Sequence, residues 1–436
     1  MERTLFFELL AWKNKKDRKP LIIQGARQVG KTWLMKFFAE FEYENYVYIN
    51  FENKEYLQSI FLEDFDIDRI LQAFQAETKI LPVPGKTLII LDEIQEAKRG
   101  LSSLKYFCEN APEHHIMAAG SFLGIALHEG TSFPVGKVDL LNLSPLSFFE
   151  FLNAIGEIEL LNLLQDEKWG LIKTFKSKYI EYLRLYYYIG GMPEAVLKFI
   201  ETHNFAEVRQ VQNMILNTYE RDFSKHVPTA LVPRVRMVWN SIPTQMAKEN
   251  KKFIYGALRS GARAKDFEIA IEWLLDCGLI HKVNRVEKPG MPLKAYEDFS
   301  AFKLFLNDVG LLSAMGALDI RTILNNESGF SEFKGIQAEQ FVLQQMIANG
   351  NFSIYYWSAE RSDGEIDFLV QYKNKIVPIE VKSAENLKAK SLKVFVEKYD
   401  QKQAVRISLS DYRKEEWLTN IPLYTIGILS KIIERA

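Results

Sequence analysis

Consecutive residues near the N-terminus have the types and spacing of a phosphate-binding loop. Gly25, Gly30, Lys31 and Thr32 fill the fixed positions of the pattern G-x-x-x-x-G-K-[ST]. The glycines allow backbone N–H groups to converge on phosphate oxygens, and the lysine can neutralise the β and γ phosphates. The threonine hydroxyl can bind Mg²⁺. The expected nucleotide-binding residues are therefore Gly25, Ala26, Arg27, Gln28, Val29, Gly30, Lys31 and Thr32.

Two acids follow a fully apolar segment further along the chain. Residues 87–91 are typical of a buried strand, which Asp92 and Glu93 then end. Asp92 can hold Mg²⁺ through its water shell, and Glu93 can position and deprotonate the attacking water. The alternative is a strand that merely ends in solvent-exposed acids, but the phosphate loop upstream favours the catalytic interpretation.

A second group of charged residues occurs in the last third of the chain. Glu380 and Lys382 are two apart on a predicted strand, so they point to the same face, and Asp367 lies on the preceding predicted strand. Glu339, on a predicted helix, can supply a third acid. Asp367, Glu380 and Glu339 would hold Mg²⁺, and Lys382 would position or activate water for phosphodiester hydrolysis. The alternatives are ordinary charge alternation on a solvent-facing strand and a nuclease-like fold without turnover.

The elements that must position the first group alternate between strands and helices. Predicted strands lie at residues 21–23, 46–51, 87–93, 115–121 and 138–143, and predicted helices at 33–38, 55–80 and 101–109. Ser121 ends the fourth strand and can sense the γ phosphate. One strand separates the phosphate loop from the acidic strand, and residues 20–150 thereby resemble the AAA-type and related additional-strand ATPases. The expected fold class is α/β, a P-loop ATPase with a central parallel sheet.

The middle of the chain combines helical patterns with a predicted hairpin. Strands are expected at residues 279–286 and 293–296, joined by a Pro- and Gly-containing turn. Helices followed by a hairpin are compatible with a winged-helix module, in which Arg259, Arg263 and Lys265 lie near the candidate recognition helix. A protein-contact module or an ATPase lid fits the same pattern.

Resemblances to known families then cover nearly the whole chain. Asp367 with Glu380-Val381-Lys382 resembles the PD-(D/E)xK nuclease superfamily. With Gly190-Gly191-Met192-Pro193 and Asp308-Val309-Gly310, the whole layout resembles prokaryotic AAA-family ATP-binding proteins that carry a DUF4143 domain. The resemblance implies ATP binding. The expected domains are an ATPase at 1–200, a helical or winged-helix domain at 201–300, and a C-terminal α/β nuclease-like domain at 301–436.

Two functions remain open at this point. The first is Mg²⁺-dependent ATP hydrolysis coupled to a C-terminal domain that binds and cleaves nucleic acid. The second is a nucleotide-switched binding protein with slow turnover, whose nuclease-like domain only recognises a partner. ATP and Mg are thus the expected cofactors, and DNA is a candidate partner. A ring-forming assembly would need an arginine from a neighbouring copy, for which Arg99, Arg221 and Arg234 are alternatives.

The composition places few further limits. The 436 residues carry a formal net charge of -1, so no global positive field predicts a nucleic-acid binder. The 2 cysteines, Cys108 and Cys277, fit a reducing compartment, and no apolar stretch is long enough to span a membrane. We expect a cytoplasmic protein without a membrane partner. An oligomer is compatible with the sequence, which leaves its state and the choice among DNA, RNA and protein open.

Overall fold

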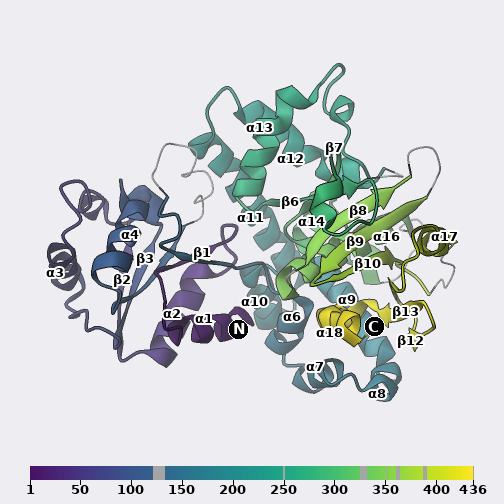
Figure 1. Cartoon of the computed structure of the whole chain (residues 1–436), viewed down its shortest axis with the longest axis horizontal. Coiled ribbons are helices and arrows are strands. Elements are labelled where there is room, and N and C mark those ends of the chain that lie inside the picture. The colour runs from purple at the N-terminus through teal and green to yellow at the C-terminus, as the bar shows by residue number, and fades with distance from the viewer. Residues whose placement is uncertain are drawn as a thin grey trace. The chain divides into compact units, whose positions relative to one another are not determined.

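The computed structural model describes residues 1–120, 133–248, 251–324, 331–350, 352–359, 364–385 and 390–435. These residues form two compact units (Figure 1). The N-terminal unit contains residues 2–144 together with 276–278, and the larger unit contains residues 145–275 and 279–436. Ser121, the expected γ-phosphate sensor, lies outside the described residues.

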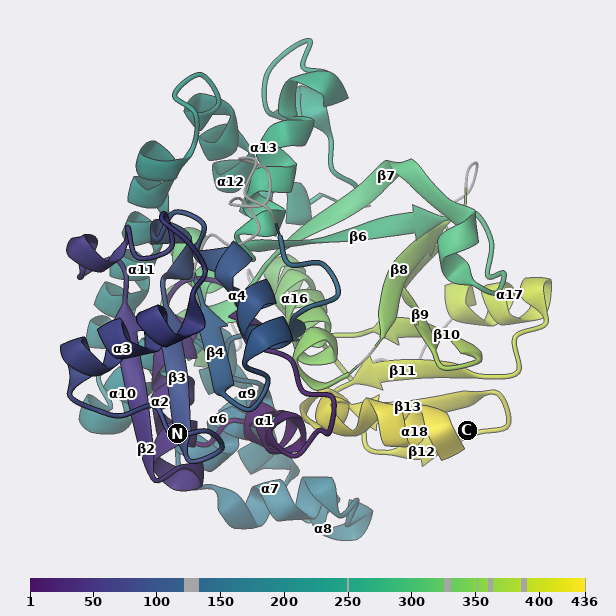
Figure 2. The ribbon, with the colours of Figure 1, turned by 60° about the vertical axis from the view of Figure 1, so that its left-hand side comes forward.

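A parallel sheet forms the centre of the N-terminal unit. Its strands are β1 (Leu21–Gln24), β2 (Asn45–Asn50), β3 (Thr87–Asp92), β4 (His115–Ala119) and β5 (Asp139–Asn142). The 5-stranded order is β2-β3-β4-β1-β5, and each neighbouring pair is parallel. Figure 2 shows β2, β3 and β4 side by side. The expected α/β fold with a central parallel sheet, in which one strand separates β1 from the acidic strand, is confirmed.

Apolar strands and amphipathic helices explain the core of this unit. All residues of β3 and β4 are buried, as expected for strands covered on both faces. The helices are α1 (Leu5–Lys13), α2 (Lys31–Glu42), α3 (Ile67–Thr78) and α4 (Gly100–Asn110). The helix expected over residues 55–80 is shorter than predicted. Asp66 accepts a hydrogen bond from the N–H of Arg69 and thereby caps α3 at its start, after a short 3-10 turn at Glu55–Leu57.

Helices make up most of the first half of the larger unit. They are α6 (Phe148–Ala154), α7 (Ile158–Gln165), α8 (Trp169–Thr174), α9 (Lys176–Ile189), α10 (Pro193–Thr202), α11 (Phe205–His226), α12 (Val232–Met246) and α13 (Ala264–Asp276). Ser147 and Glu150 form a capping box at the start of α6. Pro193 begins α10, where its missing N–H costs nothing.

A mixed sheet organises the rest of the larger unit. Its strands are β6 (Ile280–Val286), β7 (Glu297–Leu306), β8 (Ser353–Ser358), β9 (Glu365–Tyr372), β10 (Lys375–Val381), β11 (Ala404–Ser408), β12 (Arg413–Lys414) and β13 (Leu418–Pro422). The 8-stranded order is β12-β13-β11-β10-β9-β8-β6-β7. The helices α14 (Val309–Met315), α15 (Ile320–Leu324), α16 (Ser331–Asn349), α17 (Lys390–Tyr399) and α18 (Leu429–Arg435) complete the unit.

The predicted hairpin in the middle of the chain needs correction. Residues Leu293–Tyr296 form a 3-10 helix, and the strand that pairs antiparallel with β6 is β7, at Glu297–Leu306. The cause is local, since Pro292 opens that turn before the chain becomes extended. β6 also pairs with β8, so this hairpin belongs to the same sheet as the C-terminal strands. The division into domains at residues 200 and 300 stays a prediction.

Candidate functional site

The phosphate loop connects the end of β1 to the start of α2. Gly25 has a φ of 142° and Gly30, the N-cap of α2, has a φ of 95°. A Cβ at Gly25 would lie 2.2 Å from the carbonyl oxygen of Leu143, so only glycine fits there. The glycines of the pattern therefore allow the tight backbone path that the loop requires.

Lys31 is folded back onto the loop. Its ammonium donates hydrogen bonds of 2.8 Å to the carbonyl oxygens of both Gly25 and Ala26. Burial lowers the pKa of Lys31 to about 8, although the charges of Glu93 and Asp92 oppose that shift. The cation is thus held at the loop, close enough to both acids to interact with them electrostatically.

Thr32 and Asp92 bring the two halves of the site together. The hydroxyl of Thr32 donates a hydrogen bond of 2.7 Å to Oδ2 of Asp92, and the hydroxyl of Tyr48 donates one of 2.9 Å to the same oxygen. Burial raises the pKa of Asp92, whose residue is only 2% exposed. A hydroxyl and a carboxylate are the oxygen ligands that Mg²⁺ prefers, so Thr32 and Asp92 fit this ion.

Glu93 follows Asp92 in a left-handed conformation, with a φ of 49°. Its Oε2 accepts a hydrogen bond of 2.6 Å from the side-chain amide of Gln95. Gln95 belongs to a 3-10 turn at Ile94–Glu96, directly after the acidic strand. The expected general base therefore has its carboxylate oriented by a neighbouring side chain.

Tyr48 and Gln95 are contacts of the site that the sequence reasoning missed. Tyr48 lies on β2, whose last residue, Asn50, is paired in register with Asp92. Asn50 donates a hydrogen bond of 3.3 Å to the Tyr48 hydroxyl. The sequence signal for this contact is the pair of polar residues Tyr48 and Asn50, which lie near the carboxyl end of the strand next to the acidic strand.

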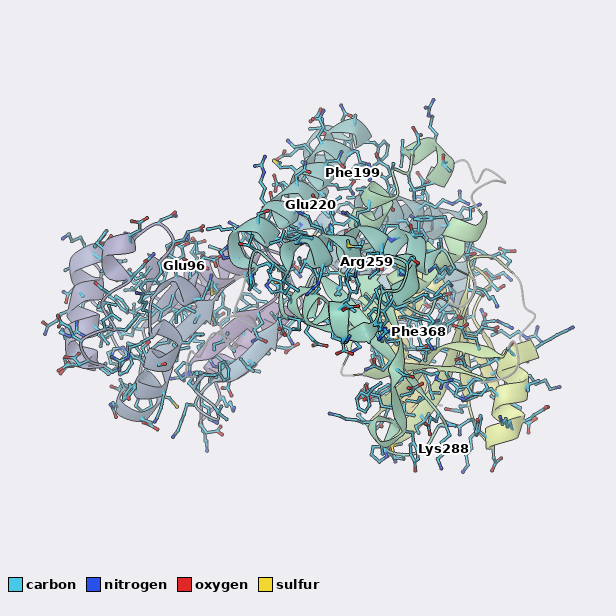
Figure 3. All side chains as sticks on the ribbon, turned by 90° about the horizontal axis from the view of Figure 1, so that it is seen from above. Glu96, Phe199, Glu220, Arg259, Lys288 and Phe368 are labelled. Carbon is cyan, nitrogen blue, oxygen red and sulfur yellow. The ribbon has the colours of Figure 1, made fainter. Side chains whose placement is uncertain are left out.

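The second expected constellation lies in the larger unit, on elements of the mixed sheet and on α16. Asp367 precedes Phe368 of β9, which Figure 3 labels, and its Oδ2 accepts a hydrogen bond of 2.8 Å from the N–H of Val381. The ammonium of Lys382 lies 3.0 Å from Oε1 of Glu380. The charges of Glu339 and Asp367 also influence each other. Asp367 lies on β9, Glu380 on β10 and Glu339 on α16, while Lys382 directly follows β10. Electrostatic interactions link Glu339 to both Asp367 and Lys382, so the expected side chains lie in one neighbourhood.

Two lysines that the sequence patterns did not indicate join this neighbourhood. Lys251 forms an ion pair with Glu339, and Lys303, which is 1% exposed, forms one with Glu365. Burial acts to lower the pKa of Lys303, but the carboxylates of Glu339, Glu365 and Asp367 outweigh it and raise the pKa. The acids are therefore compensated by ammonium groups of the protein itself.

The carboxylates respond to these surroundings in opposite directions. Burial and the charge of Glu339 raise the pKa of Asp367 to about 7. Burial opposes ionisation of Glu339 too, but the attraction of Lys251 and Lys303 lowers its pKa. One oxygen of Glu339 and one of Glu380 are buried without a hydrogen-bond partner in the structure. In the described part of the chain, no three His, Cys, Asp or Glu residues gather closely enough to hold a metal ion.

The candidate recognition segment of the middle region is α13 with the residues before it. Arg263 precedes the helix, and its N–H donates a hydrogen bond of 3.1 Å to Asp266. Lys265 is the second residue of α13, and Arg259 is exposed in the preceding turn.

The described helices include none that is long and apolar enough to cross a membrane.

Comparisons with known proteins divide the chain into three matched segments. Residues 17–152 match the family model of an AAA domain, residues 180–323 a domain of unknown function (DUF8612), and residues 334–426 a domain of unknown function (DUF4143). Comparison with curated proteins finds no matching sequence.

Among solved structures, the chain is similar to the Walker-type ATPase PABY2304 of Pyrococcus abyssi. The identity is 15%, the match covers 72% of this chain and 95% of that one, and the TM-score is 0.46. It is also similar to the Orc1 protein of Aeropyrum pernix in complex with DNA, at 12% identity, over 72% and 90% of the two chains, with a TM-score of 0.27. On the family matches and the order of its parallel sheet, the chain carries an AAA domain of the P-loop ATPase fold in its N-terminal unit and a DUF4143 domain in its C-terminal part.

Proposed function

We propose that the N-terminal unit binds ATP with Mg²⁺ and hydrolyses it. The observation that carries this proposal is the hydrogen bond of 2.7 Å between Thr32 and Asp92, which joins the helix after the phosphate loop to the acidic strand. These two side chains belong to the separate sequence patterns that nucleotide hydrolysis requires together. The AAA family match over residues 17–152 supports the same function.

Each residue then has a defined task. The loop N–H groups and the Lys31 ammonium bind the phosphates, exchanging the carbonyl contacts of Lys31 for phosphate oxygens. Thr32 and Asp92 would hold Mg²⁺, which would offset the negative charge on the phosphates. Glu93 accepts a proton from the attacking water. The oxygen of this water forms a bond to the γ phosphorus, and the bond between the γ phosphorus and the β–γ bridging oxygen breaks. The products are ADP and phosphate.

The test separates binding from turnover. Lys31→Ala should abolish nucleotide binding, measured with a fluorescent ATP analogue. Glu93→Gln should keep binding but lower the hydrolysis rate by at least about a hundredfold, because the general base is lost. Unchanged hydrolysis in Glu93→Gln would refute the role of Glu93, and nucleotide binding by Lys31→Ala equal to the wild type would refute the site.

A second proposed function concerns the C-terminal part, where Asp367, Glu380, Lys382 and Glu339 would form a site for cleaving nucleic acid. Because no three acids of the described chain gather closely enough to hold a metal ion by themselves, one or two of these carboxylates would bind Mg²⁺ together with the substrate phosphates. The specific observation in its favour is that Glu339 and Glu380 each have a buried carboxylate oxygen without a partner. Such oxygens carry a cost that a bound cation would remove. The competing proposal is a recognition domain without turnover, in which Lys251 and Lys303 permanently compensate the acids.

Plasmid nicking in Mg²⁺ or Mn²⁺ distinguishes these two proposals. Cleavage by the wild type that is lost in both Asp367→Ala and Lys382→Ala supports the nuclease. Equal nicking by all three proteins assigns the activity to contamination, and the absence of nicking by the wild type favours the recognition domain. Hydrolysis of ATP with and without DNA or RNA then tests whether the two activities are coupled, with the winged-helix interpretation of residues 201–300 as the candidate contact.

A further inference from the structure

A basic groove lies beside the acidic end of β3 in the N-terminal unit. We define this basic groove by Gln95, Lys98, Arg99, Lys105, Tyr106 and Lys137, which line a hollow of about 970 Å³. Lys98 and Arg99 follow the 3-10 turn after Glu93, and Lys105 and Tyr106 belong to α4. The groove is therefore built from the segment that directly follows the expected catalytic base.

Charge and aromatic surface occur together in this groove. Lys98, Arg99 and Lys105 are exposed, and the acid that also lines the groove, Glu109, forms an ion pair of 2.9 Å with Lys137. The Tyr106 ring stacks on Phe65 with centroids 4.1 Å apart, and the Arg99 guanidinium lies 4.2 Å from the same Phe65 ring. Cations along a groove with aromatic rings are the features that bind single-stranded nucleic acid, through phosphates and stacked bases.

Gln95 connects this groove to the hydrolysis site. Its Nε2 donates the hydrogen bond of 2.6 Å to Oε2 of Glu93, while its Oε1 is buried without a partner in the structure. Gln95 is the neighbour of Glu96, which Figure 3 labels in the N-terminal unit. One amide thus holds the general base with its donor end, while its acceptor end is buried without a partner, on a residue that lines the groove.

We propose that the basic groove binds single-stranded nucleic acid, and that Gln95 communicates this binding to Glu93. When the Gln95 amide turns toward the groove, a base N–H satisfies Oε1, which is buried without a partner in the absence of a strand, and the Glu93 carboxylate is released to accept a proton from water. Hydrolysis of ATP is therefore slow without a strand and faster with one. This second step rests on the proposed ATPase function, whereas binding of the strand does not.

Binding is tested by fluorescence anisotropy with a labelled oligothymidylate and the full-length protein. Lys98→Glu and Lys105→Glu should each weaken binding by about tenfold and reduce the salt slope of log K by about 0.7 for each phosphate that is no longer neutralised. Lys86→Glu is the matched control, because Lys86 is also exposed but precedes β3 at its opposite end. Equal affinity in all three variants would overturn the proposal, as would competition by polyglutamate as effective as that by unlabelled oligothymidylate.

Coupling is tested by ATP hydrolysis with and without the same oligothymidylate. Lys98→Glu and Lys105→Glu should keep the basal rate and lose the stimulation, while Gln95→Ala should hydrolyse ATP at the stimulated rate without any strand. A basal rate in Gln95→Ala equal to that of the wild type, with stimulation intact, would overturn the role of Gln95. The two proposals can fail separately. If the wild type does not bind ATP while both the wild type and Lys31→Ala bind the oligothymidylate, the proposed ATPase function is refuted and strand binding by the basic groove is still supported.

Discussion

The carboxylate of Asp308 accepts a hydrogen bond of 2.6 Å from the backbone N–H of Gly191, although 117 residues separate them in the chain. The other oxygen of Asp308 caps α14 by accepting a hydrogen bond of 2.9 Å from the N–H of Leu311. A side-chain amide of α16, from Gln344, donates a further hydrogen bond of 3.1 Å to Asp308. One buried carboxylate therefore ties together the end of α9, the start of α14 and α16.

Gly190 must be glycine for this arrangement to form. Its φ of 76° and ψ of -165° are accessible almost exclusively to glycine, and a Cβ there would lie 2.1 Å from Oδ1 of Asp308. Gly190→Ala should lower the free energy of unfolding by roughly 3 kcal/mol or more, from backbone strain and steric overlap together. Urea denaturation followed by fluorescence measures this change.

Gly156→Ala provides the control for the backbone contribution alone. Gly156 has a φ of 87°, but a Cβ there would meet nothing within 4 Å. We expect a loss of only about 1 kcal/mol in this variant. Equal losses in the two variants would contradict the steric role of Asp308.

The sequence predicted the parts of the molecule whose evidence is local. The phosphate loop needs glycines at fixed spacing, and β3 reveals itself as an apolar run that ends in Asp92, so both could be found without a structure. The contact between Asp308 and Gly191 could not be found in this way, because it depends on the packing of two helix ends that are far apart in the sequence. Tyr48 and Lys303 escaped for the same reason, since their partners are supplied by other strands.

The affinity for ATP should fall as the pH rises through the pKa of Lys31. Burial sets this pKa to about 8 in the nucleotide-free protein, and phosphate oxygens bind the protonated form. The fraction of protein with a charged Lys31 decreases above that pH, so ATP should bind roughly tenfold more weakly at about pH 9 than at about pH 7.5. Isothermal titration calorimetry should also detect proton uptake on binding. A Lys31→Arg variant that still binds ATP should show no such pH dependence, and a constant wild-type affinity would contradict the prediction.

Tyr48 should determine how strongly the site holds Mg²⁺. Its hydroxyl donates to the same oxygen of Asp92 that accepts from Thr32, so it helps to orient this carboxylate. Tyr48→Phe removes the hydroxyl but keeps the ring that lies 3.7 Å from the ammonium of Lys36. The Mg²⁺ concentration for half-maximal hydrolysis should rise by roughly tenfold.

Tyr46→Phe, two residues earlier on β2, is the matched control for this change. It should leave the Mg²⁺ requirement unaltered, and both variants should bind ATP in EDTA as the wild type does. An identical Mg²⁺ requirement in Tyr48→Phe and the wild type would show that Thr32 and the backbone suffice to position Asp92.

Lys303→Met should destabilise the larger unit in a pH-dependent way. Lys303 is buried among Glu339, Glu365 and Asp367, and its removal takes a cation away from all three carboxylates, of which Glu339 keeps its ion pair with Lys251. The variant should lose about 3–5 kcal/mol of unfolding free energy near neutral pH, as is usual when one partner of a buried ion pair is removed. Without the ammonium the pKa of Asp367, which already lies at about 7 in the folded wild type, rises further, and the pKa of Glu339 rises as well, so the folded state takes up protons more readily than the unfolded state. Stability should therefore be largely restored as the pH falls toward about 4 and be lost as it rises.

Lys282→Met on β6 separates this effect from the loss of any lysine. Lys282 lies 3.8 Å from the exposed Glu272, and a surface ion pair of this kind contributes at most about 1 kcal/mol. Urea denaturation of both variants across this pH range gives the comparison. A loss of unfolding free energy in Lys303→Met that is the same at every pH would contradict the compensation of the carboxylates. It would mean that the Lys303 side chain stabilises the unit by packing, for example against the Tyr356 ring, whose centroid lies 4.8 Å from its ammonium.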